Sequence, residues 1–302
     1  MSRAFRIPLR TRFRGQDERT GLLLHGPCGW GEFSPFPEYP PEVARRWLQA
    51  ANEAVSTPWP EPKRRTIPVN VTVPAVSAEE AHALVAASGC STAKVKVAEG
   101  DDEGRIEAVR DALGPSGKLR VDANGAWNVD QAREALERLG RYDLEYAEQP
   151  VASLGEMAQL RRIVDLPLAV DEPVRTDAAP GDLKLTESAD IVVLKVQPLG
   201  GVWPALEVAE RAGLPAVVSS ALETSVGISA GLALAAALDE LPYACGLATV
   251  ALLAGDVVSD PLLPRDGVIV LRRPEVSEQA LDRWEIEAGA WLQRARAAEE
   301  TS

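Results

Sequence analysis

Thr92-Ala-Lys-Val-Lys-Val97 is the stretch that decides how this chain is organised. Its alternation predicts a β-strand that carries Lys94 and Lys96 on the same face. Burying two ammonium groups is costly unless other groups compensate their charge. Taken alone, the stretch fits an edge strand with both lysines in water equally well. The sequence on either side decides between the two interpretations.

From Ile67 onward, short apolar segments alternate with helical segments of about ten residues or more, a pattern typical of a parallel sheet covered by helices. Strands are predicted at Ile67–Val73, Thr92–Val97, Leu119–Asp122, Leu144–Glu148, Leu168–Asp171, Ile191–Lys195, Ala216–Ser219 and Cys245–Ala248. Helices are predicted at Ala78–Ala87, Gly104–Leu113, Val129–Leu139, Leu154–Val164, Trp203–Ala212 and Ser225–Leu238. Eight strands joined by right-handed crossovers favour closure into a barrel over an open sheet.

The segments outside this pattern predict a second, smaller unit. Residues 1–65 contain two short strands, a loop rich in Gly, Pro and aromatic residues that starts at Gly29, and a helix from Glu42 to about Val55. After Asp260 the alternation stops, and a strand and a helical tail follow. We therefore expect an α+β capping domain of residues 1–65, completed by about residues 261–302, and a barrel of residues 66–260.

Composition excludes several classes of function. The chain has 302 residues and a formal net charge of −13, so it lacks the basic surface that nucleic acid or an anionic membrane would need. Three scattered cysteines predict free thiols in a reducing compartment, and no apolar stretch resembles a signal peptide, so we expect a cytoplasmic protein. Two histidines are too few for a histidine-rich zinc site, and they make a Ser-His-Asp triad improbable.

Polar residues recur at the carboxyl ends of the predicted strands, the height at which barrels build their active sites. Successive positions in this series lie 23 to 27 residues apart, which is one strand and one helix. The series, completed by a glycine on the eighth strand, is Asn70, Lys96, Asp122, Glu148, Asp171, Lys195, Ser219 and Gly246.

Three acids, Asp122, Glu148 and Asp171, end adjacent strands. Converging carboxylates repel one another, so a cation between them is expected. Oxygen ligands without His or Cys indicate a hard ion, of which Mg²⁺ fits best. The alternative is that these acids cap helices or pair with arginines. Strand alternation favours Asp171 over Glu172 as the inward-facing acid.

The second and sixth strands stand on opposite sides of an eight-stranded ring, so Lys96 and Lys195 would face each other across its mouth. Lys94, one layer below Lys96, would lower the pKa of Lys96 from about 10.4 towards the roughly 7–8 that suits a base. A carboxylate bound to Mg²⁺ has a more acidic α-proton. These parts indicate proton removal by lysine and stabilisation of the resulting enediolate.

Several motifs carry a resemblance to a known family. The sequence resembles the enolase superfamily, muconate-lactonizing subgroup, at Lys94–Lys96, Arg120–Gly125, Tyr146–Pro150, Ala169–Glu172 and Leu194–Gly201. Gly29–Pro35 is similar to the capping-domain loop of the o-succinylbenzoate synthases, and Ser219–Gly227 to their seventh-strand loop. The resemblance covers essentially the whole chain and implies an α/β fold, a modified TIM barrel of the (β/α)₇β type with an α+β cap.

The resemblance also implies an activity. The family dehydrates 2-succinyl-6-hydroxy-2,4-cyclohexadiene-1-carboxylate to o-succinylbenzoate in menaquinone (vitamin K2) biosynthesis, with Mg²⁺ that Mn²⁺ can replace. By position, Asp122, Glu148 and Asp171 would bind the metal, Lys96 would be the base and Lys195 would stabilise the enediolate. Substrate contacts would come from Lys94, Arg120, Asn124, Ser219, Ser220 and Gly246.

Two other functions stay open at this point. The same lysines and acids can racemise N-acylamino acids, such as N-succinylamino acids, with one base on each face of the substrate. Dipeptides fit less well, because Cys245–Thr249 offers no acid to hold a substrate ammonium group. A non-catalytic barrel used for binding is the remote alternative. A small-molecule carboxylate is the expected partner, and the sequence leaves the oligomeric state undetermined, a monomer being compatible with it.

Overall fold

The computed structural model describes residues 2–301. Its N-terminal strands β1 (Ser2–Phe13), β2 (Gln16–Gly26) and β3 (Gly29–Phe33) form an antiparallel sheet beside helix α1 (Pro41–Ser56). Both β1 and β2 are longer than predicted, and β3 occupies the start of the segment expected to be a loop. Leu22, Leu23 and Leu24 of β2 pair with residues of both β1 and β3. This pairing extends the antiparallel sheet into the segment that was expected to be a loop.

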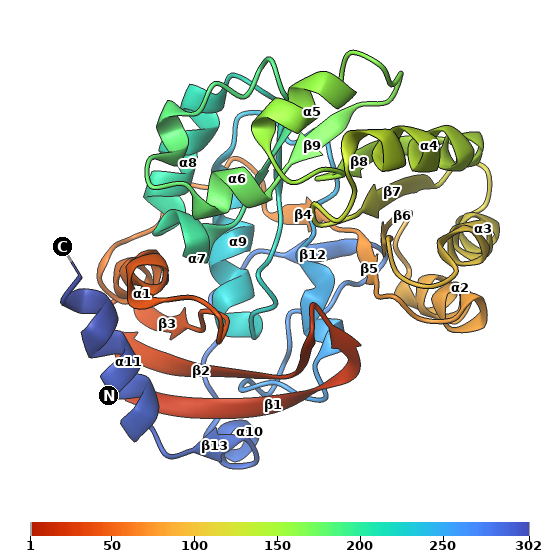
Figure 1. Cartoon of the computed structure of the whole chain (residues 1–302). Helices are drawn as coiled ribbons and strands as arrows, with labels where there is room; N and C mark the ends of the chain where they lie inside the picture. The colour runs from red at the N-terminus through yellow and green to blue at the C-terminus, as the bar shows by residue number, and fades with distance from the viewer. Residues whose placement is uncertain (1, 302) are drawn as a thin grey trace.

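The C-terminal tail returns to the N-terminal sheet. It contains α10 (Glu278–Asp282), β13 (Glu285–Ile286) and α11 (Gly289–Glu299) in place of the single helical tail expected from the sequence. Strand β13 pairs with β1, so the four-stranded sheet runs β13-β1-β2-β3 (Figure 1). This pairing supports our proposal that residues 261–302 complete a cap formed by residues 1–65. The barrel lies between these two segments in the sequence.

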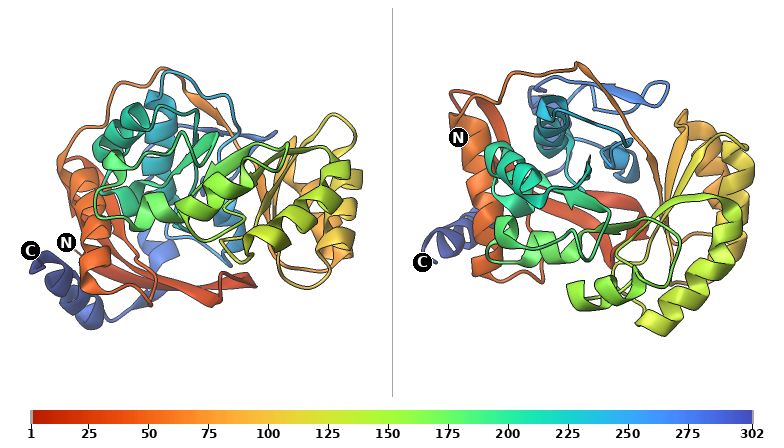
Figure 2. Two further views of the ribbon diagram at one scale, coloured as in Figure 1. Left: turned by 45° about the horizontal axis from the view of Figure 1, so that its top comes forward. Right: turned by 90° about the horizontal axis from the view of Figure 1, so that it is seen from above.

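Seven parallel strands form the barrel sheet in the order β11-β10-β9-β8-β7-β6-β5. They arc around a common centre with helices on the outside (Figure 2). Their bounds are β5 (Val71–Val73), β6 (Thr92–Lys96), β7 (Lys118–Asp122), β8 (Leu144–Glu148), β9 (Leu168–Val170), β10 (Ile191–Leu194) and β11 (Ala216–Val218). The helices between them are α2 (Ala78–Ser88), α3 (Asp102–Leu113), α4 (Val129–Leu139), α5 (Leu154–Leu160), α6 (Glu172–Thr176), α7 (Val196–Leu199) and α8 (Val202–Ala212), and α9 (Ser225–Ala237) follows β11. The predicted fold class, a modified TIM barrel with a separate α+β sheet, is confirmed.

The first and eighth predicted strands differ from expectation. The first splits into β4 (Thr66–Pro68), which pairs with β12 (Val268–Val270), and the parallel strand β5. The eighth is reduced to Cys245, which bridges to Val69, and Gly246, which bridges to Ser219. A Cβ atom on Gly246 would lie 2.5 Å from the Ser219 Oγ, so the glycine leaves room for the Ser219 side chain where the barrel closes. A 3₁₀ helix, Ala248–Leu252, then ends the strand.

Local sequence fixes where the barrel helices begin. The helices α2, α4 and α5 start with capping boxes built by Ser77 and Glu80, Asn128 and Gln131, and Ser153 and Glu156. Helix α9 is different, because 12 of its 13 residues are buried. It packs within the protein, and among residues 2–301 no helix is both long and apolar enough to cross a bilayer.

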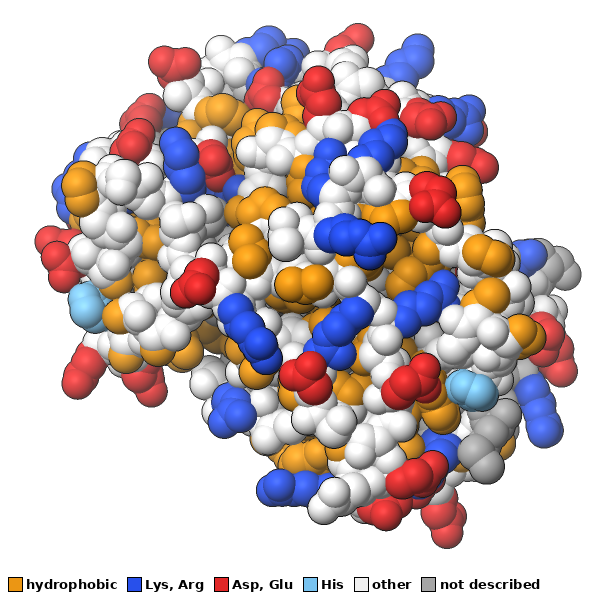
Figure 3. All heavy atoms as spheres, turned by 180° about the vertical axis from the view of Figure 1, so that it is seen from behind, with side chains coloured by type: hydrophobic (Ala, Val, Ile, Leu, Met, Phe, Trp, Pro, Cys, Tyr) orange, Lys and Arg blue, Asp and Glu red, His pale blue; other side chains and the backbone are white. Residues whose placement is uncertain are grey.

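The surface carries charges of both signs. Seen from behind, acidic and basic side chains are interspersed among small hydrophobic areas (Figure 3). The chain as a whole has 45 acidic and 32 Lys or Arg residues.

Candidate active site

Strand register brings the central site residues side by side. Lys96 on β6 pairs with Asp122 on β7, and Asp122 pairs with Glu148 on β8. Asp171 directly follows β9, and Lys195 directly follows β10. All five residues lie at the carboxyl ends of barrel strands, and each of the three acids is only 1% exposed.

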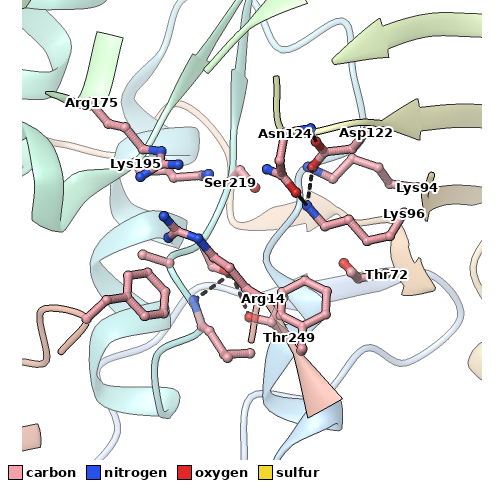
Figure 4. A pocket seen from close by; sticks show the side chains of 15 residues that line it. Arg14, Thr72, Lys94, Lys96, Asp122, Asn124, Arg175, Lys195, Ser219 and Thr249 are labelled. Atoms are coloured by element: carbon pink, nitrogen blue, oxygen red, sulfur yellow. Dashed lines mark hydrogen bonds and ion pairs between the residues drawn. The ribbon is translucent and has the colours of Figure 1, made fainter. Parts of the chain in front are cut away.

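Each lysine is held by a carboxylate. The Nζ atom of Lys96 lies 2.5 Å from Asp122 Oδ2 and 2.5 Å from Asn124 Oδ1. The Nζ atom of Lys195 lies 2.6 Å from Asp171 Oδ2. Lys195 and Lys96 enter the site from opposite sides (Figure 4). This is the arrangement expected of two groups that act on opposite faces of one ligand.

Lys94 is paired more closely than the sequence argument assumed. Its Nζ atom lies 2.7 and 2.8 Å from the two carboxylate oxygens of Glu148 and 3.4 Å from Asp122 Oδ2. Burial works to lower the pKa of Lys94, but Glu148 and Asp122 outweigh it and raise the pKa above its ordinary value. The sequence predicts that Lys94 acts on Lys96 as a neighbouring cation, and this role stays a prediction. The structure adds that two acids, Glu148 and Asp122, compensate the charge of Lys94.

The pKa values of the three acids differ because their neighbours differ. Burial, and then the charge of Asp122, raise the pKa of Glu148 to about 7. Burial also opposes ionisation of Asp122, yet Lys96 and Lys94 hold its pKa well below the ordinary range. Against the same burial, Lys195 and Arg175 lower the pKa of Asp171 to about 2. Three acids and three lysines thus share one buried site, as a site for a charged ligand requires.

The donor set suits a hard cation, although each carboxylate is turned towards a lysine. Among residues 2–301, no three Asp, Glu, His or Cys side chains are close enough together to form a ready-made metal site. The lysine ammonium groups between the acids account for this spacing. One buried oxygen, Asp171 Oδ1, accepts no hydrogen bond within the described chain. A buried carboxylate oxygen of this kind fits a magnesium ligand.

A cavity of about 40 Å³ lies directly above these groups. Figure 4 shows its lining from close by. Seven of the predicted site residues line it, namely Lys94, Lys96, Asp122, Asn124, Lys195, Ser219 and Ser220. The hydroxyl oxygens of Ser220 and Thr249 lie 2.6 Å apart, which ties the seventh-strand loop to the end of the barrel.

Four predicted site residues do not line this cavity. Glu148 and Asp171 are buried beneath it, and Gly246 lies behind Ser219. Arg120 is 1% exposed, and its guanidinium donates to Glu145, Asn70 and the Ala244 carbonyl oxygen. The family resemblance implied that Arg120 supports Lys96 and the substrate carboxylate. The structure instead uses it to brace the barrel interior, since its donors are taken up by internal acceptors.

Known proteins share both the sequence and the fold of this chain. The family model described as "Enolase C-terminal domain-like" matches residues 76–276, and the one described as "Enolase N-terminal domain-like" matches residues 4–55. An o-succinylbenzoate synthase from Thermobifida fusca is 58% identical over 98% of this chain and 95% of its own length. The chain belongs to the o-succinylbenzoate synthase family of the enolase superfamily.

Solved structures of the superfamily have the same architecture. The muconate cycloisomerase from Pseudomonas fluorescens superposes with a TM-score of 0.79 at 19% identity, covering 95% of this chain and 98% of that one. The N-succinyl Arg/Lys racemase from Bacillus cereus superposes with a TM-score of 0.78 at 23% identity, covering 95% and 97%. At these identities the superpositions establish the architecture that this o-succinylbenzoate synthase family member shares with them, and nothing finer.

Sequence reasoning missed eight of the residues that line this cavity, and three of them carry a charge or reach it from the hairpin. Phe13 and Arg14 line the cavity from the tip of the β1–β2 hairpin, and Arg175 lines it from α6. Arg175 follows Asp171 by four residues, a spacing that on a helix returns a side chain towards the acid, and its Nε atom lies 3.4 Å from that carboxylate. The Arg14-Gly15 pair could have predicted a hairpin turn. No local signal indicates that the turn lies over the barrel.

Proposed function

We propose that this protein dehydrates 2-succinyl-6-hydroxy-2,4-cyclohexadiene-1-carboxylate to o-succinylbenzoate, with Mg²⁺, in menaquinone biosynthesis. The observation that carries the proposal is that Lys96 and Lys195 line opposite sides of one cavity, which lies over three buried acids. The family supports it, because curated relatives at 46–58% identity are o-succinylbenzoate synthases, which makes the chain a lyase of this type. Its three cysteines are free thiols, which supports a cytoplasmic enzyme.

In this proposal Lys96 removes the substrate's α-proton and then delivers it to the departing hydroxyl group. Asp122 and Asn124 hold the Nζ atom of Lys96 at the end of β6, so its direction is fixed before substrate arrives. Lys195 lies on the opposite side and stabilises the negative charge that develops on the substrate. Loss of water makes the ring aromatic, so the protein has to supply only proton transfer and charge stabilisation.

Asp122, Glu148 and Asp171 would hold the Mg²⁺ ion, which Mn²⁺ could replace. When bound, the ion neutralises charge on the substrate carboxylate next to the carbon that loses its proton. The chain's own part is to bury these acids, to present oxygen ligands alone, and to keep Lys94 beside Glu148 as a compensating charge. A ring carboxylate is thereby directed to the floor of the cavity.

The test is dehydration of the cyclohexadiene substrate by the purified protein with and without Mg²⁺. We expect activity only with the ion, and we expect Lys96→Ala to lower kcat by at least about 10³-fold, because it removes the base. Lys118→Ala, at the start of β7 and exposed, serves as the matched control. Full activity of Lys96→Ala would refute the assignment of the base.

A second candidate is racemisation of N-succinylamino acids, which the two facing lysines would also support. Incubation with both enantiomers in D₂O distinguishes the reactions. Rapid α-deuterium exchange of both enantiomers with negligible dehydration would favour the racemase, whereas dehydration without such exchange would favour the synthase.

A further inference from the structure

Phe13 and Arg14 form a partition between two spaces at the barrel mouth. The inner one is the cavity of about 40 Å³ above the lysines and acids. The outer one is a hollow of about 510 Å³ between the hairpin tip and the loops after β6 and β7. Both are lined by Phe13, Arg14, Lys96 and Asn124. Phe13 and Arg14 therefore form the part of the inner cavity's wall that the β1–β2 hairpin contributes.

The backbone at Arg14 is unusual for such a large residue. Arg14 has a φ of 52° and Gly15 a φ of 72°, so they form the two-residue turn between β1 and β2. Asn, Asp and Gly are the residues that favour the first position of this turn, whereas arginine adopts it at a conformational cost. A costly residue held at the rim of an active site indicates that its side chain has a function there.

The charge of Arg14 is poorly compensated compared with its neighbours. Its guanidinium stacks 4.2 Å from the centre of the Phe36 ring and donates to the Tyr39 hydroxyl at 3.0 Å. Its nearest carboxylate is that of Glu38, half exposed, at 3.8 Å. Within residues 2–301, no carboxylate therefore lies within hydrogen-bond distance of this cavity-lining cation.

The other cations of the cavity already have partners. Lys94, Lys96 and Lys195 pair with the three buried acids. Arg175 donates to Glu172 at 2.6 Å, and it also donates to the Tyr39 hydroxyl that accepts from Arg14. The shared Tyr39 oxygen fixes Arg14 beside Arg175 and leaves other guanidinium N–H groups of Arg14 available to an anion.

We propose that Arg14 binds the second carboxylate of the substrate, the one at the end of its succinyl chain. The inference rests on the proposed function, in which the ring carboxylate lies over the buried acids. The succinyl carboxylate then needs a cation on the opposite, cap side of the cavity, and Arg14 supplies it. Product carries the same chain and binds the same way. Arg14 is therefore a specificity-determining residue contributed by the cap.

The test compares two ligands that differ only in this carboxylate. With Mg²⁺ present, o-succinylbenzoate and 2-butanoylbenzoate are titrated calorimetrically into the parent protein and into Arg14→Met, Arg14→Gln and Arg14→Lys. A charge-assisted pair of this kind predicts that the Met and Gln variants bind o-succinylbenzoate about 10- to 100-fold more weakly. Their affinity for 2-butanoylbenzoate should stay within about twofold, and Arg14→Lys should recover part of the loss. Arg12→Met is the control, since Arg12 is exposed and lines only the outer hollow.

Three outcomes would overturn the inference. Equal weakening of both ligands in the Arg14 variants would mean that Arg14 only supports the shape of the cap. Unchanged binding of o-succinylbenzoate would place the carboxylate elsewhere. A parent protein that binds neither ligand would refute the proposed function, and this inference with it, which separates that failure from the first two.

Discussion

We predict that the buried carboxyl group of Glu32 makes the stability of the protein depend on pH. It lies on β3, is 3% exposed, and its carboxylate meets the first turn of α9. It accepts from the backbone N–H groups of Thr224 and Gly227, each at 3.1 Å, and from the hydroxyl groups of Thr224 at 2.5 Å and Ser34 at 2.6 Å. Burial, and then the nearby charge of Glu223, raise the pKa of Glu32 to about 7.

The size and sign of the effect follow from this pKa. In the unfolded chain the carboxyl group has its ordinary pKa of 4.5, against about 7 in the fold. Between these values the folded protein keeps a proton that the unfolded chain has lost, so stability falls as pH rises. The full difference corresponds to about 3 kcal/mol, which is lost by about pH 8.

The perturbation is Glu32→Gln, which cannot ionise. We expect the free energy of unfolding of the parent, relative to this variant, to fall by about 3 kcal/mol between pH 4.5 and pH 8. Denaturant unfolding at four pH values in that range measures this change. Any difference in stability between the parent and Glu32→Gln that does not depend on pH cancels from the comparison. Glu38→Gln, an exposed carboxylate on the following loop, is the control and should leave the pH profile unchanged. Parallel profiles for the parent and Glu32→Gln would refute the reasoning.

Two further substitutions test the site and the fold. Glu148→Gln should weaken Mg²⁺ binding at least about tenfold, measured by calorimetry, because it removes a buried oxygen ligand, whereas the exposed Glu134→Gln should not. Gly201→Ala should destabilise the protein by roughly 2–3 kcal/mol in thermal unfolding, because Gly201 has a φ of 143° and its Cβ atom would displace the Glu53 carboxylate that caps α8. Gly213→Ala, with a φ of 64° and open space around it, should cost only about 1 kcal/mol. Equal affinity for Mg²⁺ in Glu148→Gln, or equal melting temperatures for the two alanine variants, would contradict these expectations.

Periodicity made the barrel predictable. Alternation at Thr92–Lys96 and the spacing of about 25 residues between strand ends are local properties, so they predicted parallel strands and the acids and lysines at their ends. The observed register, which places Lys96 beside Asp122 and Asp122 beside Glu148, follows from those equal repeats. The hairpin strands were also recognisable, although their length was not, because a strand extends only as far as its neighbours can pair with it.

Other parts of the site depend on distant contacts. The segment around Cys245 could not be recognised as two bridging residues, since its form depends on Val69 and Ser219 at the seam of the barrel. Arg120 has the same local sequence whether it faces substrate or the interior, and only Glu145 and Asn70 decide in favour of the interior.

The sequence by itself determined the fold class, the family and the set of lysines and acids, because repeating patterns and short motifs encode these locally. Only the tertiary structure decided which charges neutralise one another. Lys94, within the stretch Thr92–Val97, pairs with Glu148 from another strand. Arg14 lies in the β1–β2 turn, far in sequence from the barrel strands, yet it lines the cavity at the barrel mouth. The physical reason is that electrostatic compensation depends on distances of a few ångströms in space, which sequence separation does not report.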